Sequence, residues 1–99
     1  MVITDAILEP YLAAINSDDP EGHLLRLVID FKKQGGTQAE AEAIVYQAGE
    51  ESGEWNKGNK RDAAIEGVLC CIAGYCCLSN HIFREGFDEG HLWRKLPPV

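Results

Sequence analysis

Three carboxylates, at Glu50, Glu51 and Glu54, have the one spacing in this sequence that could support metal chemistry. On a continuous helix, Glu50 and Glu54 lie four residues apart and share a face, with Glu51 beside them. Carboxylate oxygens are ligands that Mg²⁺ prefers in proteins. The run is therefore a candidate magnesium site, although Gly53 weakens a helix at this point. The alternative interpretation is an acidic helix end that is simply solvated.

This EExxE pattern resembles the first half of the metal site in all-helical nucleotide pyrophosphohydrolases of the MazG type. In that family, an ExxD pattern on the next helix completes the site. Here the next predicted helix offers Asp62 and Glu66, which are four residues apart rather than three. The resemblance implies a magnesium-dependent nucleotide hydrolase built on Glu50, Glu51 and Glu54, with the second half of its site missing. We keep this activity as the alternative hypothesis.

The same acidic run is followed directly by Trp55, a large aromatic residue at the start of a polar loop. Aromatic residues beside charges are typical of interface centres, because the ring supplies buried area and the charges steer approach. Tyr46, about two helical turns before Glu54, extends the patch. The sequence thus predicts a partner-binding site that consists of Tyr46, Glu50, Glu51, Glu54 and Trp55. In the competing interpretation Trp55 folds over the core and the glutamates are solvated.

Charge is distributed unevenly along the chain. Nine basic and sixteen acidic residues give a formal net charge of −7 at pH 7. Residues 1–54 hold eleven acids and three bases, whereas residues 55–99 hold five acids and six bases. An acidic half repels phosphate backbones and attracts basic protein surfaces. We therefore expect a basic protein partner and no nucleic acid, and the sequence leaves self-association open.

No complete set of catalytic residues or cofactor ligands is evident elsewhere in the sequence. His23 is expected to be exposed near the start of a helix. Cys77 and His81, four residues apart, would supply two ligands of a metal site that needs four. No elbow motif surrounds a serine, and no glycine-rich phosphate loop follows a strand-like segment. We therefore predict a non-enzymatic protein that holds no metal and no cofactor.

The cysteines and the N-terminus bear on the compartment. Cys70, Cys71, Cys76 and Cys77 all fall within one predicted helix. Cys70 and Cys77 would lie about two turns, or roughly 10 Å, apart, which is too far for a disulfide. We expect all four to be reduced and buried as small apolar side chains. Because no positive region and no long apolar run opens the chain, the sequence predicts a cytoplasmic protein that does not bind a membrane.

Residues 63–78, AAIEGVLCCIAGYCCL, are expected to form a buried helix around which the other elements pack. Glu66 is the only charge in this stretch, and a helix that is apolar on every side belongs in the interior. Small residues recur along one stripe, where a neighbouring helix could approach closely: Ala63, Gly67, Cys70, Gly74 and Cys77. Each glycine costs about 1 kcal/mol of helix propensity relative to alanine, which close packing would offset.

Three further helices are predicted before it from apolar residues that repeat with helical period. The first is capped by Thr4 or Asp5 and ends before the turn cluster at residues 16–19. The second runs from Pro20 to about Gln34, and the third lies between Thr37 and Gly53. Pro10 falls inside the first pattern and would either kink that helix or sit in its first turn. A capping box at residues 37–40 opens the third helix, and Gly53 marks its end. The fourth helix is capped by Asn59 or Asp62.

Residues 81–99 are expected to form an irregular tail that wraps back onto the bundle through five apolar side chains: Ile82, Phe83, Phe87, Leu92 and Trp93. No segment alternates apolar and polar residues as a strand does. Short connections between consecutive helices favour antiparallel neighbours. The sequence therefore predicts a single all-α domain over residues 1–99. Its architecture is a compact antiparallel bundle of about four helices around residues 63–78.

Small size, acidic charge and helical fold together resemble the helical immunity proteins of nuclease bacteriocins. Those small bacterial proteins neutralise a toxin by covering its basic active site. The tyrosine-pair motif on their short third helix is absent here, so the resemblance assigns no residue. It implies a protein-binding module that acts as an acidic inhibitor and covers the surface of a basic partner such as a toxin. This is the leading hypothesis, and the MazG-like hydrolase is the alternative.

Overall fold

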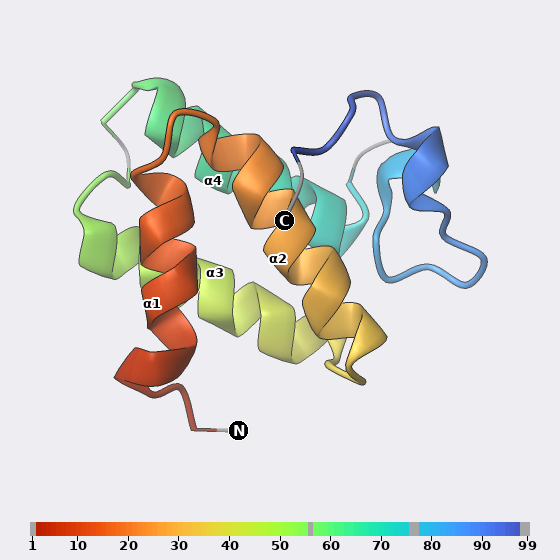
Figure 1. Cartoon of the computed structure of the whole chain (residues 1–99), viewed down its shortest axis with the longest axis horizontal. Helices are drawn as coiled ribbons and strands as arrows, with labels where there is room; N and C mark the ends of the chain where they lie inside the picture. Colours follow the sequence, from red (N-terminus) through yellow and green to blue (C-terminus); the bar gives the residue numbers. More distant parts are fainter. Residues whose placement is uncertain (1, 56, 76–77, 98–99) are drawn as a thin grey trace.

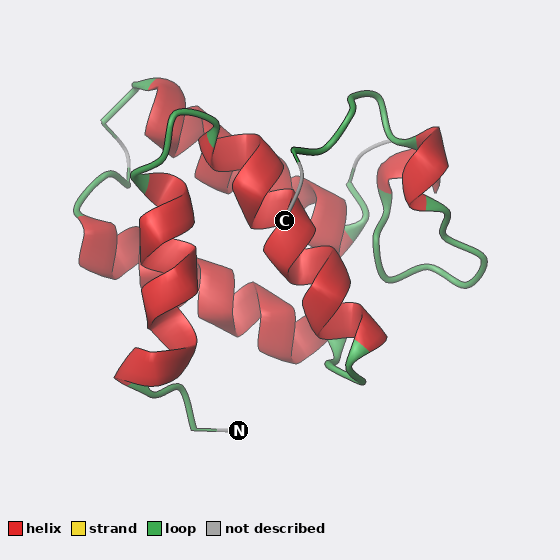
Figure 2. Cartoon of the chain, in the orientation of Figure 1, coloured by secondary structure: helices red, strands yellow, loops and turns green. Residues whose placement is uncertain are grey.

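The computed structural model describes residues 2–55, 57–75 and 78–97. Four α-helices form the bundle, and a largely irregular segment with two short 3-10 helices follows them (Figures 1 and 2). The elements in chain order are α1 (Asp5–Ile15), α2 (Pro20–Lys33), α3 (Gln38–Ser52), α4 (Lys60–Ala73), η1 (Leu78–Asn80) and η2 (Glu89–His91). No strand occurs in the described ranges. The predicted all-α bundle with an irregular C-terminal region is confirmed.

Each α-helix begins at a side chain that accepts a hydrogen bond from the first turn, as Ser, Thr, Asp and Asn residues do at this position. The caps are Thr4, Asp19, Thr37 and Asn59. Thr37 and Glu40 form the complete capping box, and Gly53 ends α3 with a left-handed backbone, both as predicted. Pro10 lies beyond the first turn of α1, which continues through it to Ile15.

The core lies where the four helices meet. Helix α1 packs against α2 and α3, and α4 packs against the same two helices. The largest side chains that are fully buried come from all four helices and the tail, and include Ile15, Leu24, Leu25, Ile29, Ile44, Ile65, Ile72 and Ile82. None of the helices in the described ranges has the length and apolar character needed to cross a lipid bilayer.

Helix α4 differs from its prediction in length and in exposure. It ends at Ala73, because Gly74 takes a left-handed backbone (φ 85°) and its N–H bonds to Cys70 O. The helix therefore stops before residue 78, and Cys76 and Cys77 lie outside the described residues. Ala64, Ile65, Val68, Cys71 and Ile72 are buried, whereas Ala63, Glu66 and Cys70 are exposed. The helix thus buries one face only.

The part of the small-residue stripe that lies on α4, at Ala63, Gly67 and Cys70, accordingly does not face a closely packed helix. A Cβ added at Gly67 would meet a single side-chain atom, Glu21 Oε2, at 3.0 Å. Ala63 and Cys70, on the same stripe, face solvent. The predicted burial of the cysteines is right for Cys71 and wrong for Cys70, because Cys70 shares the outer face with Glu66.

The C-terminal segment folds back onto α2 and α4 as predicted. Ile82 is fully buried in the core, and its N–H donates to Cys71 O at 3.1 Å. Lys32 Nζ donates to Ile82 O at 2.6 Å and also lies over the Phe87 ring, 5.0 Å from its centroid. Phe83, Phe87 and Leu92 are partly buried against the core, whereas Trp93 is 50% exposed.

Charged side chains fasten this segment at two further points. Arg94 donates to both carboxylate oxygens of Asp19 and lies 3.4 Å from Glu21 Oε1. Glu89 lies 3.3 Å from Arg26 and 3.5 Å from Lys33. Hydrogen bonds from Arg94 hold the pKa of Asp19 below its ordinary value. Because Asp19 is also the cap of α2, one carboxylate serves the helix start and the tail together.

Candidate functional site on helix α3

Two aromatic rings form the centre of the predicted partner-binding site. The ring centroids of Tyr46 and Trp55 lie 5.2 Å apart, with the ring planes tilted by 47°. This spacing falls in the range of favourable aromatic pairs, which is about 4.5–7 Å. Tyr46 is 51% exposed, whereas Trp55 is half-buried and packs against the core. The structure thus brings these two predicted residues together, with Trp55 as the anchored member and Tyr46 as the accessible one.

Gly49 makes this arrangement possible, and we did not single it out from the sequence. It is buried in α3, and a Cβ added there would lie 2.9 Å from Trp55 Cε3 and 3.3 Å from Ile65 Cγ2. The absent side chain therefore leaves the space into which the Trp55 ring packs. The signal in the sequence was a glycine inside a helix, which costs stability unless something approaches closely.

Glu50 and Glu51 are both exposed on α3, but they belong to different faces. Glu50 follows Tyr46 by four residues and therefore lies on the same face as that ring. Glu51 follows Gln47 by four residues and accepts a hydrogen bond from Gln47 Nε2 at 3.4 Å. It also lines a hollow of about 260 Å³ together with Asp5, Leu8, Glu9 and Leu12 of α1. Acidic side chains thus extend from the Tyr46 ring towards α1.

Glu54 does not lie on the helix. Because α3 ends at Ser52 and Gly53 turns the chain, Glu54 belongs to the connection to α4. Its N–H donates to Ser52 Oγ at 3.2 Å, and its carboxylate accepts from Asn59 Nδ2 at 2.8 Å. The shared helical face predicted for Glu50 and Glu54 is therefore not formed. Glu54 instead connects the end of α3 to the cap of α4.

Helix α4 does not direct carboxylates towards these glutamates either. Asp62 is 7% exposed and accepts from Gly58 N–H at 2.9 Å, while its second oxygen is buried and has no hydrogen-bond partner in the described part of the chain. Glu66 is exposed. Among the residues that the structure describes, no three His, Cys, Asp or Glu side chains gather in an arrangement that could hold a metal ion.

The histidines play no part in this surface. His23 is 37% exposed at its side chain and lies 3.9 Å from Asp18, near the start of α2. The ring of His81 occupies the space beside Gly74, and its buried Nε2 has no hydrogen-bond partner within residues 2–55, 57–75 and 78–97. The pairing of His81 with Cys77 lies outside the described residues, because Cys77 is not among them.

The arrangement on α3 is suited to binding a cationic or apolar side chain. An accessible tyrosine ring attracts a cation at its face, and Glu50 and Glu51 add carboxylates around it. No protein-family model matches the chain, and no curated protein or solved structure shows a significant match to it.

Proposed function

We propose that this chain is a non-enzymatic protein-binding module of the cytoplasm. Its α3 surface, made of Tyr46, Glu50, Glu51, Glu54 and Trp55, docks a basic protein such as a toxin. The observation that carries this proposal is the aromatic pair. A half-exposed Tyr46 ring lies 5.2 Å from the partly buried Trp55, beside exposed carboxylates.

The packing of Trp55 against the core supports a binding role for the Tyr46–Trp55 pair. Trp55 packs over Gly49 and against the core, so the Tyr46 ring has a fixed neighbour before any partner arrives. Groups that are ordered in advance lose less side-chain entropy on association. Tyrosine and tryptophan are also the residue types most often found as energetic centres of protein interfaces.

Electrostatics supports a basic partner. The half of the chain that contains α3 carries eleven acids against three bases. Such a field accelerates the approach of a basic surface and repels an acidic one. A small acidic inhibitor of the immunity type would use its surface in this way. The cytoplasmic location of this chain and a toxin as its basic partner are parts of the same proposal.

The first experiment measures association with a basic probe. A synthetic peptide library rich in arginine, lysine and apolar residues is screened by biolayer interferometry, and the hits are measured against variants. Glu50→Lys with Glu51→Lys is expected to slow association several-fold and to flatten its dependence on salt. Tyr46→Ala is expected to speed dissociation, since it removes half-exposed contact area and leaves the helical spectrum intact.

A matched control separates the α3 surface from net charge. Glu66→Lys with Glu85→Lys makes the same charge change at two exposed positions outside α3. It is expected to alter association less than the α3 pair does. Hits that bind the α3 variants and wild type equally well would place the interface elsewhere, and a library without hits would refute the basic-partner proposal.

The alternative hydrolase is tested directly. The three glutamates do not converge, and neither Asp62 nor Glu66 of α4 completes the site, so no observation favours this activity. We expect no pyrophosphate release from nucleoside triphosphates in the presence of Mg²⁺ or Mn²⁺. Turnover that Glu51→Gln abolishes would overturn the binding proposal in favour of the MazG-like enzyme.

A further inference from the structure

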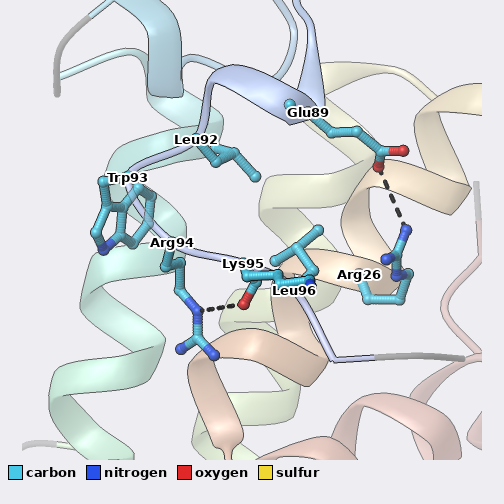
Figure 3. Close-up of a pocket in the computed structure, with 8 residues that line it drawn as sticks. Arg26, Glu89, Leu92, Trp93, Arg94, Lys95 and Leu96 are labelled. Carbon is cyan, nitrogen blue, oxygen red and sulfur yellow. Dashed lines mark hydrogen bonds and ion pairs between the residues drawn. The ribbon is translucent and has the colours of Figure 1, made fainter.

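A pocket lies between α2 and the C-terminal segment, away from the α3 surface. It has a volume of about 470 Å³ and is lined by Arg26, Glu89, Leu92, Trp93, Lys95 and Leu96, with Arg94 at one side (Figure 3). Small-molecule sites commonly measure about 300–1,000 Å³ and combine apolar walls with a few polar groups. The volume falls in that range, whereas the hollow is open to solvent and four of its eight lining residues are charged.

Positive charge collects around this pocket, although the whole chain is acidic. Three of the nine basic residues of the sequence line it, and Glu89 is the one acid that does so. Each arginine already has carboxylate partners: Arg26 pairs with Glu89, and Arg94 pairs with Asp19 and Glu21. Lys95 is exposed and has no ion-pair partner among the described residues.

The balance of these groups sets the charge that a ligand should carry. Of the three cations that line the pocket, Arg26 pairs with Glu89 and Arg94 pairs with Asp19 and Glu21. Lys95 therefore carries the positive charge that has no ion-pair partner among the described residues. A monoanion neutralises this charge, whereas the second charge of a dianion would be repelled by Glu89.

The rest of the lining favours a ligand with an apolar body. Leu92 and Leu96 project towards the middle of the pocket in Figure 3, and both also pack against the core. Trp93 is 50% exposed and offers a flat ring at the wall. In addition, Arg26 keeps a buried Nε–H that finds no acceptor among the described residues, which is an unusual state for a buried donor.

We infer that this pocket is a binding site for small monoanions with an aromatic or apolar body, of the aromatic carboxylate class. Lys95 pairs with the carboxylate, and Trp93, Leu92 and Leu96 contact the body. The site lies outside the proposed protein-binding surface and does not depend on it. A ligand of about ten heavy atoms in such a pocket is expected to bind with a Kd of about 1–10 mM.

The test follows the two indole N–H signals of the protein by NMR, with phenylacetate as the probe. Trp93→Phe assigns the Trp93 signal, and the Trp55 signal reports on the α3 surface in the same spectrum. Phenylacetate is expected to shift the Trp93 signal saturably and to leave that of Trp55 in place. The neutral phenylacetamide, which has the same ring, is expected to bind about threefold to fivefold more weakly. The cationic phenethylammonium is expected not to bind.

Two lysine variants test the cation. Lys95→Met keeps the length of the side chain, removes its charge, and is expected to make phenylacetate and phenylacetamide bind equally. Lys57→Met removes the same charge from an exposed position in the α3–α4 connection and is expected to change nothing. Because both positions are exposed, both variants are expected to fold.

Three outcomes would overturn the proposal. A Trp93 signal that does not move with phenylacetate up to about 20 mM would show that no such site exists. Equal binding of phenylacetate and phenylacetamide to the wild-type protein would leave an apolar hollow without charge recognition. Displacement of phenylacetate by an equal concentration of inorganic phosphate would show that the site reads charge and not the aromatic body.

Discussion

A missing side chain determines how the aromatic pair on α3 is built. Gly49 lets the Trp55 ring approach the α3 backbone, and Tyr46 then lies beside that ring. A glycine inside a helix costs about 1 kcal/mol relative to alanine. Here that cost is offset by the burial of part of an indole ring, which is among the largest apolar surfaces a residue can supply.

Gly49→Ala is therefore expected to destabilise the protein despite its higher helix propensity. The new methyl group would lie 2.9 Å from Trp55 Cε3, and overpacking of this kind costs about 1–3 kcal/mol. Urea unfolding of Gly49→Ala, Trp55→Ala and the double variant gives the coupling energy between the two positions. The cost of Gly49→Ala should shrink in the Trp55→Ala background, and an unchanged cost would mean that the ring does not occupy this space.

At the scale of residues, the sequence predicts which side chains lie near one another better than it predicts how they pack. The neighbourhood of Tyr46 and Trp55 followed from their spacing along the chain, whereas the shared face expected for Glu50 and Glu54 was not formed. The packing of the Trp55 ring over Gly49 did not, because it depends on how the chain turns back after Gly53. The two interpretations of Trp55 were also not exclusive: its ring packs on the core while Tyr46 beside it stays half-exposed.

At the scale of elements, helix starts were predictable and one helix end was not. Caps such as Thr37 act within one turn, so three or four consecutive residues are enough to recognise them. The end of α4 depends instead on whether Gly74 continues the helix or adopts a left-handed backbone. Gly67 and Gly74 look alike in sequence, yet one is inside the helix and the other terminates it.

Substitution of these two glycines should therefore have opposite effects. At Gly67, alanine gains up to about 1 kcal/mol of helix propensity and meets only the end of the flexible Glu21 side chain. At Gly74, alanine must hold a positive φ, which costs about 1–2 kcal/mol, and its methyl group would lie 2.8 Å from the His81 ring. In thermal unfolding, the midpoint temperature should rise for Gly67→Ala and fall for Gly74→Ala. Changes of the same sign would contradict the placement of Gly67 inside the helix and of Gly74 at its end.

At the scale of the whole molecule, the C-terminal segment completes the fold. The sequence predicted that its apolar side chains would return to the bundle, because isolated large apolar groups are buried where possible. It did not predict the pairing of Arg94 with Asp19, since many acids were available and the two residues lie 75 positions apart. Long-range ion pairs leave no local pattern in a single sequence.

The pairing of Arg94 with Asp19 should make the free energy of unfolding depend on pH in the acidic range. The pKa of Asp19 is lowered in the folded protein, chiefly by its hydrogen bonds from Arg94. Its contribution is therefore present above the unfolded-state pKa of about 3.9 and is lost as the pH falls through the lower folded-state value. Asp19→Asn keeps a good helix cap but removes the charge. The stability difference between wild type and Asp19→Asn should shrink below about pH 4.

Asp19→Ala provides the control for this prediction. It removes the cap together with the charge, and should cost about 1 kcal/mol more than Asp19→Asn at neutral pH. Urea unfolding curves for the three proteins between pH 7 and pH 2.5 make the comparison. A difference between wild type and Asp19→Asn that stays constant across this range would show that the carboxylate of Asp19 does not hold Arg94.

Because Asp19 both caps α2 and pairs with Arg94, its two contacts are expected to form at different stages of folding. The cap bond to Gly22 spans three residues, whereas the pair with Arg94 closes a loop of 75. Short loops close at low entropic cost, so the cap should already exist in the folding transition state and the tail should dock after it. Loss of Arg94, as in Arg94→Gln, should then quicken unfolding and leave the refolding rate nearly unchanged. The tail would govern how long the folded state lasts and have little effect on how fast it forms.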